Sequence, residues 1–362
     1  MTLPLLLPLP PNRVRRNYRG GQLLDAWEGA ANPIDSCHPE DWLASTTPAR
    51  NPGMEPIPDE GLSPVVTGNG SKRLLRDLFR EAPQHFLGRD HTGTQDAGLG
   101  FLAKLLDSAM RLHVQAHPTR AFARRHLGSP WGKLETYVIL GVRPGANPAI
   151  RLGFQRPPTP QAWRRIVLEQ DITAMDACFD PIPVTAGEVW LIPGGLPHAI
   201  GAGLLVLEVM EPSDLVVRCE FEREGIIVPP AARFMGRDPD LALKIFDFTP
   251  RSPDQVRAAC RIEPDITRDT PGLRFETLIG PEQTDAFRIY RATFQSSGVL
   301  PLQGQATIGF IVQGAGTLRS GFETLPLQRG RRFFAAAAAN RVEITPDTAL
   351  EVLLCTPAVA RV

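Results

Sequence analysis

The chain has 362 residues, which exceeds the usual size of one domain, so we expect two domains or one enlarged barrel with insertions. Its 39 Lys and Arg residues balance 39 Asp and Glu residues, and this neutrality argues against nucleic-acid partners and against a polybasic membrane surface. The 36 Pro and 32 Gly residues favour many short strands and turns over long helices.

The first 110 residues predict short strands and one helix. Leu74, Leu75, Leu78 and Phe79 recur at helical spacing and indicate a helix over about 72–87. The strands predicted in this part are 41–46, 64–66 and 100–107, and a Gly-rich loop covers 88–100.

The middle of the chain alternates strands with a second helix. Apolar residues that include Trp163 and Ile166 indicate this helix over about 159–179, and a helical turn is expected at 121–127. The predicted strands are 113–117, 135–140, a piece at Val184, 189–192, 199–200, 204–210 and 215–221.

The last third returns to short strands after a change in composition. Residues 236–272 are interpreted as a linker around one short helix. The strands predicted beyond it are 287–294, 308–312, 314–318, 332–334, 342–344 and 350–354. We therefore predict a mainly β fold of paired barrels or sandwiches. Its units are 1–235, with helical insertions near 72–87 and 159–179, the linker, and 273–362.

The cysteines indicate a reducing compartment. Cys37, Cys178, Cys219, Cys260 and Cys355 are dispersed and odd in number, which is typical of free thiols and argues against a thiolate metal site. The apolar start of the chain is interrupted by Pro and lacks a basic leader, so it is a poor signal peptide. We expect a cytoplasmic protein.

Two segments carry candidate metal ligands. Residues 113–117 read His-Val-Gln-Ala-His, and on a strand His113, Gln115 and His117 would share one face. The segment Gly187-Glu-Val-Trp-Leu-Ile-Pro-Gly-Gly-Leu-Pro-His198 has the spacing of the second half-motif of the cupin β-barrel, in which Gly and Pro set the turns that aim the His.

The first cupin half-motif carries a His-x-His-like pair and a later Glu, whose places are taken by Gln115-Ala-His117 and Glu135. His, Glu and Gln ligands without thiolate suit Zn²⁺, or a harder ion such as Mn²⁺ or Fe²⁺. Each residue alone has an ordinary explanation: His198 as a turn residue, Glu135 as a charged strand end, His117 as a loop cap. The combined pattern favours a metal site.

The chain resembles the type I mannose-6-phosphate isomerases, a metal-dependent family of the cupin superfamily, over roughly residues 12–250. The resemblance is carried by 112–118, 132–135, 193–198 and 211–218, with further likeness at 41–47 and 101–107. It implies two cupin-like jelly-roll barrels, with helices inserted in or beside the first, and interconversion of mannose 6-phosphate and fructose 6-phosphate.

The resemblance also implies roles for individual residues. The expected metal ligands are Gln115, His117, Glu135 and His198; the expected catalytic residues are Lys133, Asp214 and Arg218; the expected substrate-binding residues are His113 and Trp42. Three positions depart from the family pattern. The family has Ser at His113, Pro within the Lys133-Leu-Glu135 motif, and the cupin motif ends in Asn where this chain has Ala202. The change at His113 bears on the choice of sugar.

Aldose–ketose isomerisation moves a proton between C1 and C2 through a cis-enediol, and a divalent metal would polarise the oxygens. Arg218 suits an enediolate oxygen or a phosphate, whereas Asp214, Lys133 or His113 could transfer the proton. Ordinary explanations also exist: a solvated Arg218 paired with Glu220, a turn residue at Asp214, and a surface lysine at Lys133.

Three functions are compatible with these residues. The leading hypothesis is a sugar-phosphate isomerase with one divalent metal, Zn²⁺ first, acting as a monomer or homodimer with neither nucleic acid nor membrane as a partner. The second is a cupin isomerase or epimerase for another sugar or sugar acid, and the third is a non-catalytic sugar-binding cupin. No histidine follows His198, so a second barrel would hold no His-based metal and would have a structural role.

Overall fold

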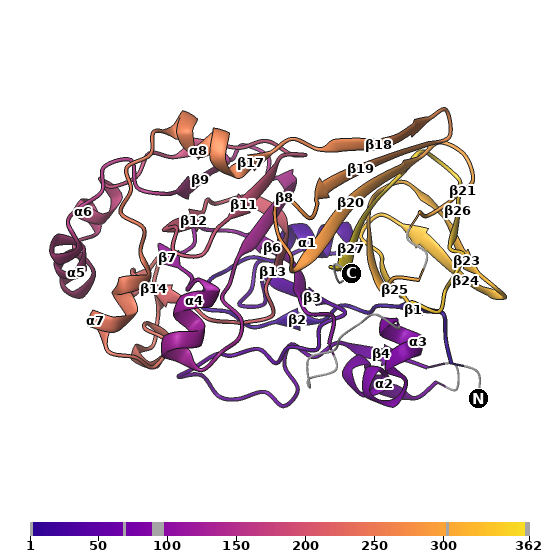
Figure 1. The fold of residues 1–362 in the computed structure, drawn as a ribbon, viewed down its shortest axis with the longest axis horizontal. Helices are drawn as coiled ribbons and strands as arrows, with labels where there is room; N and C mark the ends of the chain where they lie inside the picture. The colour runs from indigo at the N-terminus through magenta and orange to yellow at the C-terminus, as the bar shows by residue number, and fades with distance from the viewer. Residues whose placement is uncertain (1–2, 68–69, 89–97, 302–303, 359–362) are drawn as a thin grey trace.

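The computed structural model describes residues 3–67, 70–88, 98–301 and 304–358. It is a mainly β protein, as predicted, in which two β units lie side by side (Figure 1). Residues 89–97, and with them most of the predicted loop 88–100, lie outside this description. Within the described part, no helix is long and apolar enough to cross a membrane.

The first unit is built from two antiparallel sheets that face each other. The larger sheet, in the order β17-β11-β8-β13-β6-β3-β2, contains β2 (Arg13–Val14), β3 (Glu40–Leu43), β6 (Leu102–Ser108), β8 (Glu135–Val142), β11 (Val189–Ile192), β13 (Leu204–Met210) and β17 (Arg261–Ile262). The smaller, in the order β10-β9-β12-β7-β14, contains β7 (Gln115–Ala116), β9 (Ala149–Leu152), β10 (Ile182–Pro183), β12 (His198–Ile200) and β14 (Val217–Arg218).

The second unit has the same plan. Its larger sheet, in the order β1-β25-β22-β27-β20-β19-β18, contains β1 (Leu6–Pro8), β18 (Asp265–Thr270), β19 (Leu273–Ile279), β20 (Phe287–Phe294), β22 (Thr307–Gln313), β25 (Arg332–Ala335) and β27 (Leu350–Pro357). A four-stranded sheet, in the order β21-β26-β23-β24, contains β21 (Gly298–Val299), β23 (Ala315–Ser320), β24 (Glu323–Gln328) and β26 (Glu343–Pro346).

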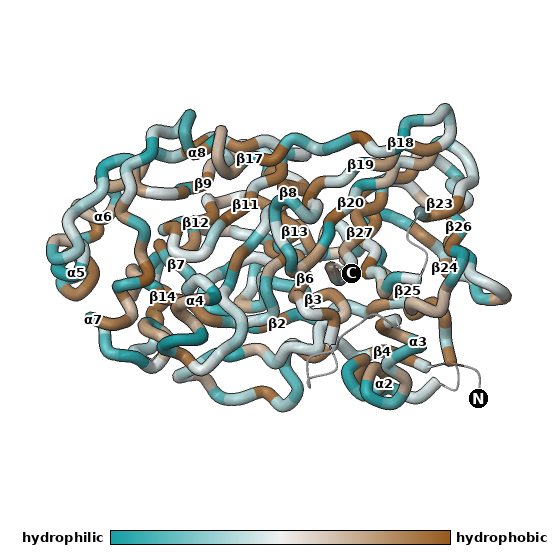
Figure 2. Tube along the Cα trace, viewed as in Figure 1, coloured by the Kyte–Doolittle hydropathy of each residue, from teal (hydrophilic) through white to brown (hydrophobic). Residues whose placement is uncertain are grey.

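Alternation along the buried strands divides their side chains between two cores. In β13, Leu205 and Leu207 pack into the core between the two large sheets, whereas Leu204 and Val206 point into the first barrel. Glu208 has the same parity as Leu204 and Val206, so this acidic side chain also faces the barrel interior. The central strands of both units are largely hydrophobic in Figure 2, with hydrophilic segments more frequent in the outer helices.

The two units share one core and exchange strands. Residues from both large sheets, Leu207 and Phe310 among them, form a single apolar cluster. Strand β1 pairs with β25 of the second unit, and β17 pairs with β11 of the first. The chain therefore crosses between the units near both expected boundaries, and the division at 235 and 273 stays a prediction.

The remaining elements surround these sheets. The helices are α1 (Gln22–Trp27), α2 (Leu75–Glu81), α3 (Pro83–Leu87), α4 (Arg120–Phe122), α5 (Pro160–Glu169), α6 (Ile172–Asp176), α7 (Pro239–Ala242) and α8 (Pro253–Cys260). A π turn follows α4 at Ala123–Leu127, and 3₁₀ turns lie at Pro230–Ala232 and Leu243–Ile245. Two small hairpins pair β4 (Pro64–Val66) with β5 (Lys72–Leu74), and β15 (Glu222–Arg223) with β16 (Ile226–Ile227).

Local chemistry explains why the predicted helices are shorter than expected. The predicted helix 72–87 begins as a strand, and Pro83 starts a second helix because proline favours the first helical turn. The predicted helix 159–179 starts at Thr159, whose side chain caps the backbone of Ala162, and is interrupted by Gln170 at φ 56°. Its buried residues pack behind the five-stranded sheet.

Two strand predictions are wrong over most of their length. The predicted linker 236–272 contains two α-helices, α7 and α8, where one was expected, and two strands, β17 and β18. Within 113–117 only β7 is strand, and within 215–221 only β14, because each of these short strands pairs over one or two residues. Val184 lies just beyond β10. The predicted linker 236–272 ends in β18, an edge strand whose residues are all exposed and therefore lack an apolar pattern.

A buried ion pair joins the two units. The Arg332 guanidinium of β25 contacts the Asp41 carboxylate of β3, and both side chains are almost fully buried. Asp41 also accepts a hydrogen bond from the backbone N–H of Asn12, at 2.8 Å. Burial raises the pKa of Asp41, so its charge depends on the guanidinium beside it.

We expect Arg332→Met to lower the free energy of unfolding by about 3–5 kcal/mol, because it leaves a buried carboxylate without its cation. The measurement is urea unfolding at neutral pH. Arg319→Met is the matched control, since Arg319 forms an exposed pair with Glu343 and should cost less than about 1 kcal/mol. Equal effects of the two substitutions would contradict the importance of this pair.

Candidate metal centre

Three segments meet at one end of the first barrel. His117 directly follows β7, Glu135 begins β8, and His198 begins β12. The backbone N–H of Gly195 donates to the carbonyl of His117 at 2.7 Å, which ties the turn before His198 to the first histidine segment. A Cβ at Gly194 would lie 2.9 Å from the carbonyl oxygen of Pro118, so this approach requires glycine.

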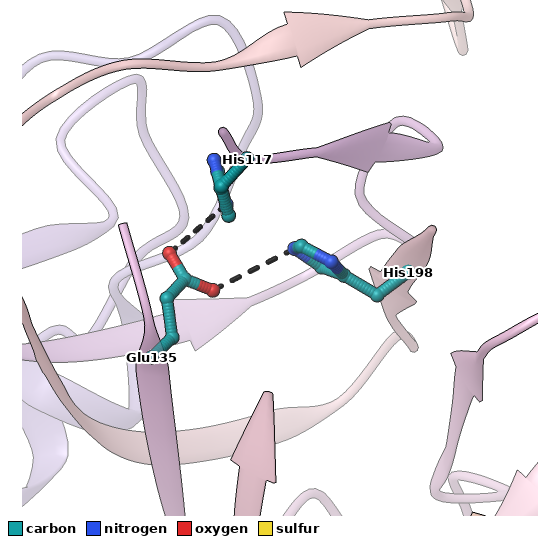
Figure 3. Close-up of side chains that lie close together, drawn as sticks. All are labelled: His117, Glu135 and His198. Atoms are coloured by element: carbon teal, nitrogen blue, oxygen red, sulfur yellow. Dashed lines mark ion pairs between the residues drawn. The ribbon is translucent and has the colours of Figure 1, made fainter. Parts of the chain in front are cut away.

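The three side chains converge on one point, as Figure 3 shows. His117 Nε2 lies 3.0 Å from Glu135 Oε1, and His198 Nε2 lies 3.6 Å from Glu135 Oε2. One ligand atom from each residue lies within 4.8 Å of the others. Each residue is only 1% exposed, so the cluster is shielded from solvent.

The backbone determines which imidazole nitrogens carry protons. His117 Nδ1 lies 2.8 Å from the carbonyl oxygen of Leu215, and His198 Nδ1 lies 2.9 Å from that of Leu196. A carbonyl oxygen only accepts, so both Nδ1 atoms donate and both neutral rings present a bare Nε2 lone pair toward Glu135. Among the residues that the structure describes, His117 Nε2 has no hydrogen-bond partner.

A divalent cation fits this donor set. Lone pairs of two imidazoles and a carboxylate face one another without a proton between them, which a positive ion would stabilise. Two ligand atoms about 2.1 Å from a tetrahedral ion are about 3.4 Å apart, close to the observed 3.0 and 3.6 Å. The Gln115 amide nitrogen lies 3.3 Å from His198 Nε2, and a half-turn of the amide would present its oxygen to the same place.

The protonation states agree with metal binding. Burial lowers the pKa of His117 to about 3 and also lowers the pKa of His198, so both rings are neutral at pH 7. Burial opposes ionisation of Glu135, but the Lys133 ammonium beside it helps to hold the pKa of this carboxyl well below its usual range. Lys133 Nζ lies 3.0 Å from Glu135 Oε1, and the Tyr137 hydroxyl donates to Oε2 at 2.7 Å.

A cavity of about 480 Å³, counting space open to solvent, lies beside this cluster. Five of the predicted site residues line it: His113, Gln115, Lys133, Asp214 and Arg218. The structure thus brings together the predicted catalytic residues. Gln115 and Lys133 join the cavity to the buried cluster through their contacts with His198 and Glu135.

Trp42 is placed differently from the other predicted site residues. It is fully buried and is not part of the cavity lining. Its indole N–H donates to Glu40 Oε2 at 2.8 Å, and Glu40 lines the cavity. The contact of Trp42 with the site is therefore through Glu40.

The sequence-based interpretation missed five ionisable residues that line the cavity: Arg16, Tyr18, Glu40, Lys104 and Glu208. Lys104 Nζ lies 3.2 Å from both Glu40 Oε1 and Glu208 Oε1, and Arg16 Nε lies 2.9 Å from Glu40 Oε2. A signal was present, because Lys104 and Glu208 are charges within otherwise apolar strands, which is rare unless the charges are paired.

These neighbours determine the charge of the cavity wall. Burial and nearby Glu135 raise the pKa of Glu208 to about 8, so this carboxyl is largely protonated at pH 7. Arg16 and Lys104 outweigh the effect of burial on Glu40 and hold the pKa of its carboxyl far below normal. Burial lowers the pKa of Arg218 to about 10, which leaves it charged.

The curated relatives of this chain that are described below are all named as mannose-6-phosphate isomerases. No protein-family model matches the chain. A mannose-6-phosphate isomerase of Streptococcus mutans is 29% identical over 161 residues, which are 43% of this chain and 49% of that protein. The probable mannose-6-phosphate isomerase GmuF of Bacillus subtilis is 28% identical over 219 residues, or 60% of this chain and 61% of that protein. The matches thus span about half to three fifths of these curated relatives.

The fold is that of the phosphomannose isomerases, mainly β with paired cupin-like barrels. The crystal structure of the mannose 6-phosphate isomerase from Bacillus subtilis matches 97% of this chain and 99% of that chain, with a TM-score of 0.73 at 19% identity. A mutant of phosphomannose isomerase from Salmonella typhimurium matches 98% of this chain and 100% of that chain, with a TM-score of 0.72 at 16% identity. The resemblance inferred from the motifs is confirmed: curated relatives and solved neighbours carry these names, consistent with a type I enzyme.

We expect His117→Ala and His198→Ala each to weaken Zn²⁺ binding by about 100-fold or more, because each substitution removes one of the imidazole nitrogens that would hold the ion. Metal content after dialysis, measured by elemental analysis, tests this. His126→Ala, outside the cluster, should retain the wild-type content. Unchanged metal content in either cluster variant would show that the site is wrongly assigned.

Proposed function

We propose that this protein is a metal-dependent aldose–ketose isomerase that interconverts mannose 6-phosphate and fructose 6-phosphate through a cis-enediol. The observation that carries the proposal is the buried cluster of two bare imidazole nitrogens and a carboxylate, next to a cavity lined by Lys133, Asp214 and Arg218. The names of the relatives support the sugar phosphate as substrate.

The ion proposed for the site is a single Zn²⁺, held by Gln115, His117, Glu135 and His198. Zn²⁺ is supported by the ligand types and by a neighbour described as a mannose 6-phosphate isomerase bound with zinc and yttrium, with a TM-score of 0.69 at 16% identity. When bound, such an ion acts as a Lewis acid on substrate oxygens. Gln115 lines the cavity, which supports contact between the site and a ligand there.

The remaining residues would hold the sugar and move its proton. Arg218 is charged and donates from Nη1 to the carbonyl of Ala232 at 2.8 Å, which leaves donors of its guanidinium for the enediolate oxygen. Asp214 is an ion-paired carboxylate, 3.3 Å from Arg16, and can accept a proton. Lys133 is the alternative proton-transfer residue, and Trp42 would act by holding Glu40.

A cupin isomerase or epimerase for another sugar or sugar acid is the second candidate, favoured by His113 in the cavity wall. A non-catalytic sugar-binding cupin is the third. The presence of proton-transfer candidates beside the metal cluster favours the enzymes. The cytoplasmic location and the monomeric or dimeric state stay predictions.

We expect the purified protein to convert mannose 6-phosphate to fructose 6-phosphate in a coupled assay, to lose this activity with a chelator and to regain it with Zn²⁺. Metal analysis on the same sample links activity to occupancy. Turnover only of unphosphorylated sugars would favour the second candidate, and binding of metal and sugar without any turnover would favour the third.

We expect Arg218→Met to lower kcat by about 100- to 1000-fold while the metal content stays unchanged, because the variant removes a charge that acts on the developing oxyanion. Steady-state kinetics with elemental analysis measure both quantities. Arg164→Met, at an exposed arginine of α5, is the control. A variant that retained wild-type kcat would exclude this role for Arg218.

A further inference from the structure

His113 is a buried, unpaired polar group in the cavity wall. Its side chain is 3% exposed, and Nε2 has no hydrogen-bond partner in the part of the chain that the structure describes. It is not a member of the metal cluster, which contains His117, Glu135 and His198. A buried polar nitrogen without a partner is costly, and the residue that carries it lines the cavity, so a ligand there would satisfy it.

The backbone around His113 is held firmly, so its position is not an accident of a loose loop. The N–H of Leu112 donates to the carbonyl of Ile200 at 2.8 Å, and the N–H of Val114 donates to the Glu220 carboxylate at 2.6 Å. Cys219 N–H donates to the carbonyl of Val114 at 2.8 Å. The ring is therefore presented to the cavity by a segment fixed on both sides.

The charges around His113 favour an anion. Arg111, Arg218 and Arg223 all act on its ring as positive charges, and the negative charge that acts on it is that of Glu220. Glu220 is already engaged, since it accepts from Arg111 at 2.6 and 2.8 Å and from Arg223 at 3.1 Å. Of the three arginines, Arg218 lines the cavity together with His113, so this part of the wall is positively charged through Arg218.

We propose that His113 determines specificity for a phosphorylated ligand, by donating a hydrogen bond from Nε2 to an oxygen of the phosphate in the electropositive part of the cavity. The proposal rests on the proposed function, because it takes the ligand to be a sugar phosphate. The resembling family has a serine at this position. The histidine ring is longer than that side chain, so its Nε2 would reach further toward the phosphate.

The geometry separates this role from metal binding. The cavity is lined by Gln115 and Lys133, which contact the cluster, and by His113 and Arg218, which do not. A ligand in the cavity can therefore place its reacting carbons toward the cluster and its phosphate toward His113. A phosphate carries more charge than a carboxylate and offers more acceptor oxygens, which suits a cavity lined by Arg16 and Arg218 as well as His113.

Binding of mannitol phosphate to the zinc-loaded protein tests the proposal without turnover, since this polyol has no carbonyl to isomerise. Affinity is measured by calorimetry for mannitol phosphate, mannitol and mannuronate. His113→Phe retains the volume but removes both nitrogens, and His113→Gln retains an N–H donor near the position of Nε2. His126→Phe, outside the cavity lining, is the matched control.

We expect His113→Phe to weaken the binding of mannitol phosphate about 10- to 100-fold, which is the range for a lost hydrogen bond to a charged group. The affinity for mannitol should not change. His113→Gln and the control should bind within a few-fold of wild type, and zinc content should not change. If the isomerase assay shows no turnover but the affinities change in this way, His113 still contacts the phosphate and only the proposed reaction is excluded.

Other outcomes overturn the proposal. Undetectable binding of mannitol phosphate to wild type, or equal weakening of phosphate and mannitol in His113→Phe, would exclude a phosphate contact. A larger effect on mannuronate would assign the site to carboxylates. Loss of zinc in both His113 variants would show that His113 acts by positioning Gln115.

Discussion

The carboxylate of Glu135, buried inside a barrel, is the constraint on which the site depends. A buried charge is tolerated only with nearby cations or metal, and Lys133 at 3.0 Å supplies part of that compensation. The two histidines offer lone pairs instead of protons, because backbone carbonyls occupy their Nδ1–H groups. The imidazole lone pairs that face Glu135 therefore lack a positive partner, which a divalent ion would supply.

The strand register extends this polar environment across the barrel. Lys104, Glu208 and Tyr137 lie directly opposite one another on the neighbouring strands β6, β13 and β8. All three point to the interior, so an acidic and a basic side chain meet where an apolar layer would otherwise continue. Glu40 then connects this row to Arg16 and Asp214. One polar layer thus links the metal cluster to the far wall of the cavity.

The motif residues could be predicted from the sequence because each half-motif is local: glycines, a proline and a histidine at fixed spacing define one turn. Arg16, Glu40, Lys104 and Glu208 could not be found in the same way. Which face of a strand points inward depends on pairing between distant segments, and a single Lys in an apolar strand does not reveal its partner. Trp42, predicted to bind substrate, packs behind Glu40 and does not line the cavity, which depends equally on pairing between distant strands. The lengths of the strands predicted at 113–117 and 215–221 could not be predicted for the same reason, because each ends where its pairing with a distant strand ends.

Strand β3 has one further consequence for the molecule as a whole. Its neighbouring residues Glu40 and Asp41 face opposite sides, so one lines the cavity and the other binds Arg332 of the second unit. A single peptide bond thus separates the cavity from the seam between the barrels. The second barrel, although it contains no histidine, is therefore coupled to the cavity through this shared strand, because a substitution at Arg332 would disturb Asp41 directly beside Glu40.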